Sequence, residues 1–157
     1  TMKELTIEHL APYLPYRLKM IFDGDENASE IVGLELGRIL LISDFGDFGS
    51  CDYDGAGKVL LRPLSDLTKE IEVDGEKFVP LIKMVKDCHF AEGYDLKFIE
   101  LPGSGSNRRH YRVFDDKAKI YWDILVYIDG MRHDYVKWLT KHHFDLYDLI
   151  PNNLAID

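Results

Sequence analysis

Cysteine is scarce in this chain of 157 residues, which contains only Cys51 and Cys88. Two cysteines are too few for the disulfide framework of a small secreted protein, and without a CxxC pair no zinc site is predicted. One disulfide or two reduced thiols both fit the sequence, and we expect reduced thiols in a cytoplasmic protein. No apolar run approaches the roughly 20 residues of a membrane-spanning helix, and the N-terminus shows no secretory signal, so we expect no membrane association.

Signatures of common catalytic sites are also missing. The chain has no GxSxG elbow for a nucleophile, no GxxxxGK[ST] loop for phosphate and no HExxH pair for zinc. Asp44-Phe45-Gly46 matches the metal-binding tripeptide of protein kinases, but the other kinase motifs are absent, so we treat the match as coincidence. The sequence therefore favours a protein that is not an enzyme, and we expect no cofactor.

What the chain does have is enough apolar sequence to fold, with 46% hydrophobic and 12% aromatic residues. The length fits one domain, which we place over residues 2–157, with Thr1 expected to be left over from recombinant expression. Strand hairpins followed by helices predict an α+β fold: a hairpin-rich antiparallel sheet, a few short helices and a C-terminal helix.

The clearest structural signal is Asp74-Gly75, which predicts a two-residue hairpin turn because both central positions of that turn need a positive φ. A second hairpin is expected around Gly37, and a helix is expected to begin at Pro80. Further strands are expected over residues 17–22, 59–62, 96–101, 110–114 and 120–128, and the C-terminal helix after Asp129.

Two stretches are expected to interrupt this regular structure. Pro12 and Pro15 should prevent a short helix over residues 7–10 from continuing, because proline lacks an N–H. Residues 44–57 are predicted to be a loop, since four Gly and four Asp break the apolar pattern.

The aspartates of that loop invite comparison with a calcium site. Aligned on Gly55, the stretch places Asp52 and Asp54 at ligand positions of an EF-hand loop, but Leu61 stands where a bidentate Glu is required. Asp52 and Asp54 are therefore weak candidates for a hard cation, and we expect no metal site.

His143 and Asp145 are the best candidates for an acid–base pair. The structural alternative is that Asp145 caps a last short helix over residues 146–150. His142, which follows the apolar spacing of the C-terminal helix, is expected to be a core or boundary residue.

One short segment opposes the acidic trend of the chain. Arg108, Arg109, Tyr111 and Arg112 could hold phosphate, a single strand or an acidic surface. On a strand, Arg108 and Arg112 share one face while Arg109 and Tyr111 share the other. The alternative is a polar edge strand whose charges prevent pairing with other sheets.

The net charge of −9 is concentrated early in the chain, where residues 1–75 hold 15 acidic and 7 basic residues. Such a surface disfavours nucleic acid and anionic lipid and suits a basic protein partner. Residues 76–112 reverse the balance, with 7 basic and 5 acidic residues.

Three stretches carry a resemblance to a known family: residues 5–16 (LTIEHLAPYLPY), residues 61–80 (LRPLSDLTKEI followed by GEKFVP), and the closing HFD and LAID at residues 143–145 and 154–157. In these the chain resembles a family of small uncharacterised proteins encoded by prophages and mobile elements of gut anaerobic bacteria. The resemblance implies the cytoplasm of a bacterial host and a phage context, and it implies no activity.

Our leading hypothesis is an accessory protein of a phage or mobile element that binds a host or phage protein, in a narrower version as a host-defence inhibitor or DNA mimic. The alternative is a small enzyme or binder for a phosphorylated or nucleotide ligand. It would hold the anion through residues 108–112, with His143 and Asp145 as acid and base. The oligomeric state is left open by the sequence.

Overall fold

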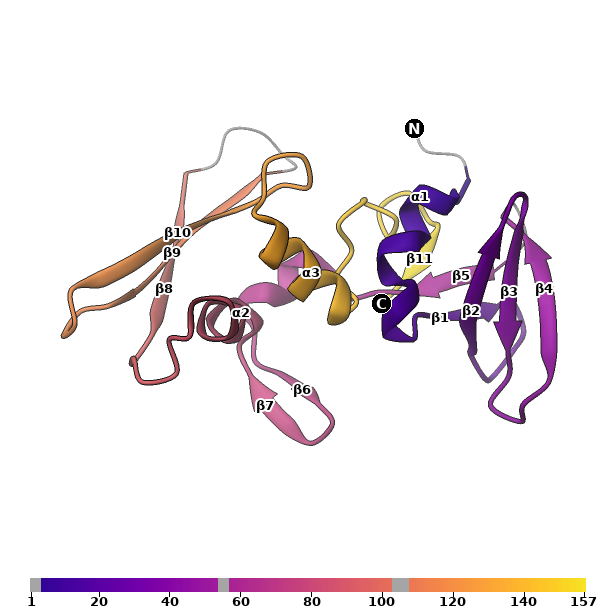
Figure 1. Ribbon diagram of the computed structural model, residues 1–157, viewed down its shortest axis with the longest axis horizontal. Coiled ribbons are helices and arrows are strands. Elements are labelled where there is room, and N and C mark those ends of the chain that lie inside the picture. The colour runs from indigo at the N-terminus through magenta and orange to yellow at the C-terminus, as the bar shows by residue number, and fades with distance from the viewer. Residues whose placement is uncertain (1–3, 54–56, 103–107) are drawn as a thin grey trace. The chain divides into compact units, whose positions relative to one another are not determined.

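The computed structural model describes residues 4–53, 57–102 and 108–157. The chain divides into two compact units, each with its own sheet (Figure 1): unit 1 consists of Thr1–Pro63 and Thr140–Asp157, and unit 2 of Leu64–Leu139. The predicted α+β class, with antiparallel hairpins and few helices, is confirmed. One domain over residues 2–157 stays a prediction.

Unit 1 is built on a six-stranded sheet in the order β11-β5-β1-β2-β3-β4. Its strands are β1 (Lys19–Phe22), β2 (Ser29–Glu35), β3 (Arg38–Ile42), β4 (Phe48–Asp52), β5 (Gly57–Leu60) and β11 (Ala155–Ile156). Neighbouring strands are antiparallel, except that β11 runs parallel to β5. The hairpin expected at Gly37 is confirmed as the β2–β3 connection.

The loop predicted over residues 44–57 is confirmed at residues 44–47 and at Tyr53, but residues 48–52 form strand β4 and Gly57 begins β5. Strand β4 pairs with β3 along its whole length, from Asp52 opposite Arg38 to Phe48 opposite Ile42. Gly and Asp are poor strand formers mainly because they pack little apolar surface. That deficit matters less here because β4 lies at the edge of the sheet and most of its residues are exposed.

The N-terminal helical segment also differs from its prediction. Helix α1 (Ile7–Leu10) has the expected bounds, and the backbone N–H of its N-cap, Thr6, donates to His9 Nδ1 at 3.1 Å. The chain then continues as the 3-10 helix η1 (Ala11–Tyr16), through both prolines. The fixed φ of proline is compatible with 3-10 geometry, so proline stops the α-helix without straightening the chain.

The C-terminal segment closes unit 1. The buried Tyr13 donates its hydroxyl hydrogen to the backbone oxygen of Phe144 at 2.5 Å. The backbone N–H of Arg62 donates to the oxygen of His143 at 2.7 Å, and the N–H of Asp145 donates back to the oxygen of Arg62 at 2.8 Å. The core of unit 1 consists of Leu5, Leu10, Tyr13, Leu18, Met20, Ile31, Ile39, Leu41, Val59, Leu61, Leu149 and Ala155.

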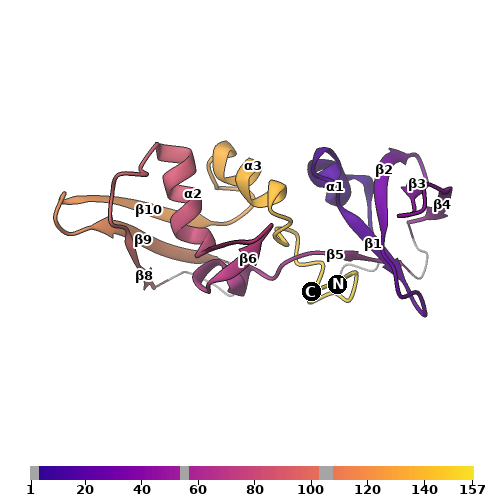
Figure 2. The same ribbon diagram turned by 90° about the horizontal axis from the view of Figure 1, so that it is seen from below.

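Unit 2 contains a three-stranded antiparallel sheet in the order β10-β9-β8, with helices at its side (Figure 2). Its elements are η2 (Leu64–Thr68), β6 (Ile71–Val73), β7 (Glu76–Phe78), α2 (Pro80–His89), β8 (Lys97–Leu101), β9 (Arg109–Asp115), β10 (Ile120–Val126) and α3 (His133–Lys141), whose last two residues belong to unit 1. The hairpin at Asp74-Gly75, the helix start at Pro80 and the strand near residues 120–128 are confirmed. Within the described ranges no helix is long and apolar enough to cross a membrane.

Candidate functional site

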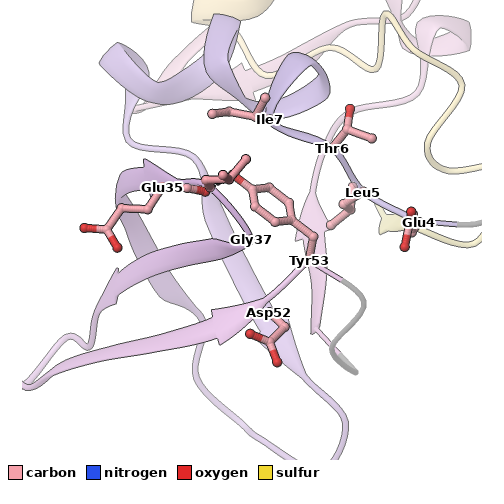
Figure 3. Close-up of a pocket in the computed structure, with 9 residues that line it drawn as sticks. Glu4, Leu5, Thr6, Ile7, Glu35, Gly37, Asp52 and Tyr53 are labelled. Atoms are coloured by element: carbon pink, nitrogen blue, oxygen red, sulfur yellow. The ribbon is translucent and has the colours of Figure 1, made fainter.

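A cavity of unit 1 lies where the start of α1 approaches the β2–β3 turn and the end of β4. It has a volume of about 500 Å³. We call it the β4-end pocket, and it is lined by Glu4, Leu5, Thr6, Ile7, Glu35, Leu36, Gly37, Asp52 and Tyr53. Figure 3 shows the ring of Tyr53 at its centre, with Ile7 above the ring and Leu5 beside it.

Local chemistry fixes the walls of this pocket. The hydroxyl of Tyr53 donates to the backbone oxygen of Glu35 at 3.1 Å, which joins the end of β4 to the β2–β3 turn. Gly37 has a φ of 82°, a conformation that L-residues rarely adopt, and the turn leaves the side chain of Leu36 fully exposed beside the cavity. Partial burial raises the pKa of Tyr53, so its hydroxyl keeps its proton and remains a donor.

Three carboxylates surround this apolar centre, those of Glu4, Glu35 and Asp52. In Figure 3 the side chains of Glu35 and Asp52 point outward from the rim. In the described part of the chain, none of the three lies within 4.0 Å of a basic nitrogen, although Arg38 is directly opposite Asp52 on β3. The pocket therefore combines an apolar floor with an acidic rim.

This composition suits a ligand that is both basic and apolar. The residues that line the pocket include no histidine, cysteine, lysine or arginine. A rim of carboxylates attracts a cation, and an apolar floor gains free energy when it covers an aliphatic or aromatic group. An apolar side chain flanked by basic residues has both properties.

Of the two weak cation candidates, Asp52 lines the β4-end pocket and Asp54 lies outside the described residues. Across residues 4–53, 57–102 and 108–157, no three His, Cys, Asp or Glu side chains are grouped closely enough to hold a metal ion.

His143 and Asp145, the candidate acid–base pair, both serve the packing of unit 1. Nε2 of His143 donates to the backbone oxygen of Tyr16 at 2.5 Å, and burial lowers the pKa of the imidazole. The Asp145 carboxylate accepts the backbone N–H groups of Leu149 and Ile150 at 2.9 and 2.8 Å. Asp145 therefore caps the next turn, as the structural alternative held, although that turn is not a helix.

The arginine-rich segment lies in unit 2 and largely on β9. The side chain of Tyr111 is 1% exposed and belongs to the buried face of the sheet, where its ring cannot stack on a ligand. Arg109 is opposite Val126 in the register and shares the face of Tyr111. Arg108 precedes the strand, and its guanidinium carbon lies 4.5 Å from the ring centre of Tyr127.

Arg112 faces the other side of the sheet, and its charge is already matched. Its guanidinium donates to both oxygens of Asp123, at 2.8 and 3.2 Å, and lies 4.5 Å from the ring centre of Tyr121. An Arg–carboxylate fork of this kind occupies the donors that phosphate would use. The segment thus divides its side chains between two faces of one sheet, and no common anion site results.

A cluster in unit 2 was not anticipated from the sequence. Nε2 of His89 hydrogen-bonds the hydroxyl of Tyr135, and its ring centre lies 5.4 Å from that of Trp122. Arg132 forms a two-point ion pair with Asp134 at 3.1 and 2.7 Å, and burial together with Arg132 lowers the pKa of His89. These residues come from α2, β10, α3 and the loop before α3, with no shared motif, so no sequence signal pointed to them. Each has its partner within the cluster, which indicates packing.

Comparison with known protein families, curated protein sequences and solved structures found no match to this chain. Among the predicted site residues that the structure describes, only Asp52 lines the β4-end pocket. The other pocket residues were missed because no motif connects the start of α1, the β2–β3 turn and Tyr53, which follows β4 in a turn. The pocket's own geometry therefore carries the functional conclusion.

Proposed function

We propose that this chain is a non-catalytic interaction module, an accessory protein of a phage or mobile element, and that unit 1 binds a basic segment of a host or phage protein. The β4-end pocket carries the proposal, because its apolar floor and acidic rim suit one apolar side chain flanked by lysine or arginine. The fully exposed Leu36 adds apolar surface that a partner would cover.

The charge of unit 1 supports a basic partner. Over the residues assigned to it, the sequence has 14 acidic and 7 basic residues, against 14 and 12 in unit 2. A field of this sign speeds the encounter with a basic segment and weakens as salt is added. We therefore expect the partner to be recognised at unit 1, and binding to weaken between low and physiological ionic strength.

A peptide array tests the proposal directly. Its probes are peptides in which one leucine or phenylalanine is flanked on both sides by lysines, beside matched peptides with glutamates in place of the lysines. We expect the full chain to bind the lysine set alone. The variant Leu36→Ser, which removes an exposed apolar side chain without changing the charge of the rim, should lose most of this binding because the apolar contact is lost.

The matched control is Phe90→Ser, which makes the same kind of change at an exposed apolar residue of unit 2. Binding to the lysine set should be the same for this variant and the unchanged chain. Equal binding of the two peptide sets, or no loss with Leu36→Ser, contradicts the proposed function.

A further inference from the structure

We propose that the basic segment binds in the extended conformation, as an additional strand along the open edge of β4, with its apolar side chain in the β4-end pocket. This inference rests on the proposed function and specifies how the partner is held. In such strand addition, main-chain hydrogen bonds supply affinity and a pocket for one side chain supplies specificity.

The edge of β4 is open and carries few of the usual protections. Strand β4 is last in the sheet order, and in the described ranges no strand pairs with its outer side. Natural edges are commonly guarded by lysine, proline, a bulge or very short length. β4 has five residues without lysine, proline or bulge, whereas β11 at the opposite edge has only two residues.

The register shows which backbone groups of β4 face this edge. The N–H of Ser43 donates to the oxygen of Asp47 at 2.9 Å, which makes them a hydrogen-bonded pair at the start of the β3–β4 ladder. Bonded and non-bonded pairs alternate along an antiparallel ladder. Phe48, Ser50 and Asp52 are therefore non-bonded toward β3, and their N–H and C=O groups point to the open edge.

The sheet face beside the open edge is itself uncovered at β4. A Cβ added at Gly49, the second residue of β4, would point out of the sheet and meet no heavy atom within 4 Å. Glycine inside a strand often marks a place where another backbone approaches. Phe45 and Phe48, at the end of β4 away from the pocket, are 85% and 80% exposed and offer a second apolar contact.

Charge favours a basic segment over a second copy of this chain. Asp47 directly precedes β4, Asp52 is its last residue, and Glu35 lies on the rim of the β4-end pocket. Two copies paired through β4 would bring these carboxylates together, and like charges facing across strands are destabilising. A strand with lysine or arginine beside its apolar residue would instead neutralise them.

N-methylated peptides test the binding mode. The probe is the tightest-binding lysine-flanked peptide of the array, prepared in two versions that carry N-methyl groups on alternate residues. Only every second amide of an added strand faces its neighbour. We expect one version to lose at least about tenfold in affinity, the effect of a few lost hydrogen bonds, and the other to bind like the parent.

Amide hydrogen exchange on the full chain gives a second readout. Peptide binding should slow exchange at Phe48, Ser50 and Asp52, while Gly49 and Cys51, already bonded to β3, serve as internal controls. Equal effects of the two methylated versions, or unchanged exchange at the three outward amides, overturn strand addition while the proposed function stands. If exchange at these three amides becomes slower as the protein concentration rises, in the absence of peptide, the occupant of the edge is a second copy of the chain. That result would overturn the inference. If no lysine-flanked peptide binds, the proposed function itself fails.

Discussion

Burial shifts the pKa values of two titratable residues of unit 1, Asp145 and His143, and leaves both with structural roles. Burial raises the pKa of Asp145, and the N–H groups of Ile150 and Leu149 act against that shift. Burial lowers the pKa of His143, with Arg62 acting in the same direction and the carbonyl of Tyr16 against it. Both side chains are thus used to hold a turn and η1 in place, and neither is left available for proton transfer.

The lowered pKa of His143 predicts a pH dependence of stability. Below pH of about 6.5 the unfolded chain protonates this imidazole while the folded chain resists, so the unfolded state binds more protons. Stability should therefore fall as the pH decreases from about 7.5 toward the folded pKa. His143→Gln, which keeps a hydrogen-bond donor but cannot titrate, should reduce this loss, as measured by urea unfolding at pH 7.5 and 5.5.

Other groups also affect stability between pH 7.5 and 5.5, and the comparison of the unchanged chain with His143→Gln separates their effect from that of His143. Burial lowers the pKa of His9 and of His89, so both add to the same trend, whereas Asp145 contributes with the opposite sign. All three are unchanged in His143→Gln, so the difference between the two proteins belongs to His143. Identical pH dependence of the two proteins would contradict the prediction.

Among the elements, the β6–β7 hairpin depends on its turn. Asp74 and Gly75 have φ values of 52° and 82°, as the Asp-Gly pattern predicts for a turn with two left-handed residues. Gly75→Ala should destabilise the hairpin by about 1 kcal/mol, because an L-residue is strained in this conformation. Urea unfolding measures the loss, and hydrogen exchange at residues 71–78 locates it.

Asp74→Asn is the matched control for that experiment. Asparagine tolerates the left-handed conformation as well as aspartate does, so this variant should unfold like the unchanged chain. If both substitutions reduced the free energy of unfolding by a similar amount, the loss in Gly75→Ala would not come from strain at the left-handed position, and the prediction would be wrong.

The elements also show where sequence reasoning succeeds. The Asp74-Gly75 hairpin and the start of α2 at Pro80 were predicted because each depends on the backbone chemistry of one or two residues. Strand β4 was missed because it is held by pairing with β3, a contact that local composition does not reveal. The path of η1 through Pro12 and Pro15 was missed because proline excludes an α-helix more strictly than a 3-10 helix.

Most of the candidate site could not be predicted from the sequence, because it too depends on contacts between distant segments. The β4-end pocket joins the start of α1, the β2–β3 turn and the end of β4, which are separate in the chain. No motif connects Leu5, Leu36 and Tyr53, so only the fold brings them together. The predicted arginine segment, by contrast, was easy to notice, and the register of β9 then divides its side chains between two faces.

On the scale of the whole molecule, unit 2 is inserted into unit 1. The chain leaves unit 1 after Pro63 and returns at Thr140, and the backbone bonds between Arg62 and His143 place these two points of unit 1 close together. Insertions of this kind are tolerated when the ends of the inserted segment can lie near each other.

Excision tests whether the two units form one domain. We expect residues 64–141, which keep α3 whole, to fold alone and unfold cooperatively, because unit 2 has a sheet and buried residues of its own. Residues 1–63 joined by a short Gly-Ser linker to residues 142–157 should also fold. Circular dichroism during heating measures both. Excised pieces without a cooperative transition would support the single domain predicted from the length.

The parallel pairing of β5 with β11 has a consequence for folding during synthesis. Val59 pairs with Ala155, so this part of the sheet cannot form until nearly the whole described chain has left the ribosome. All of unit 2 is made in the interval and can fold first. A folded unit 2 shortens the flexible loop that must be closed, and so lowers the entropy cost of the last pairing of unit 1.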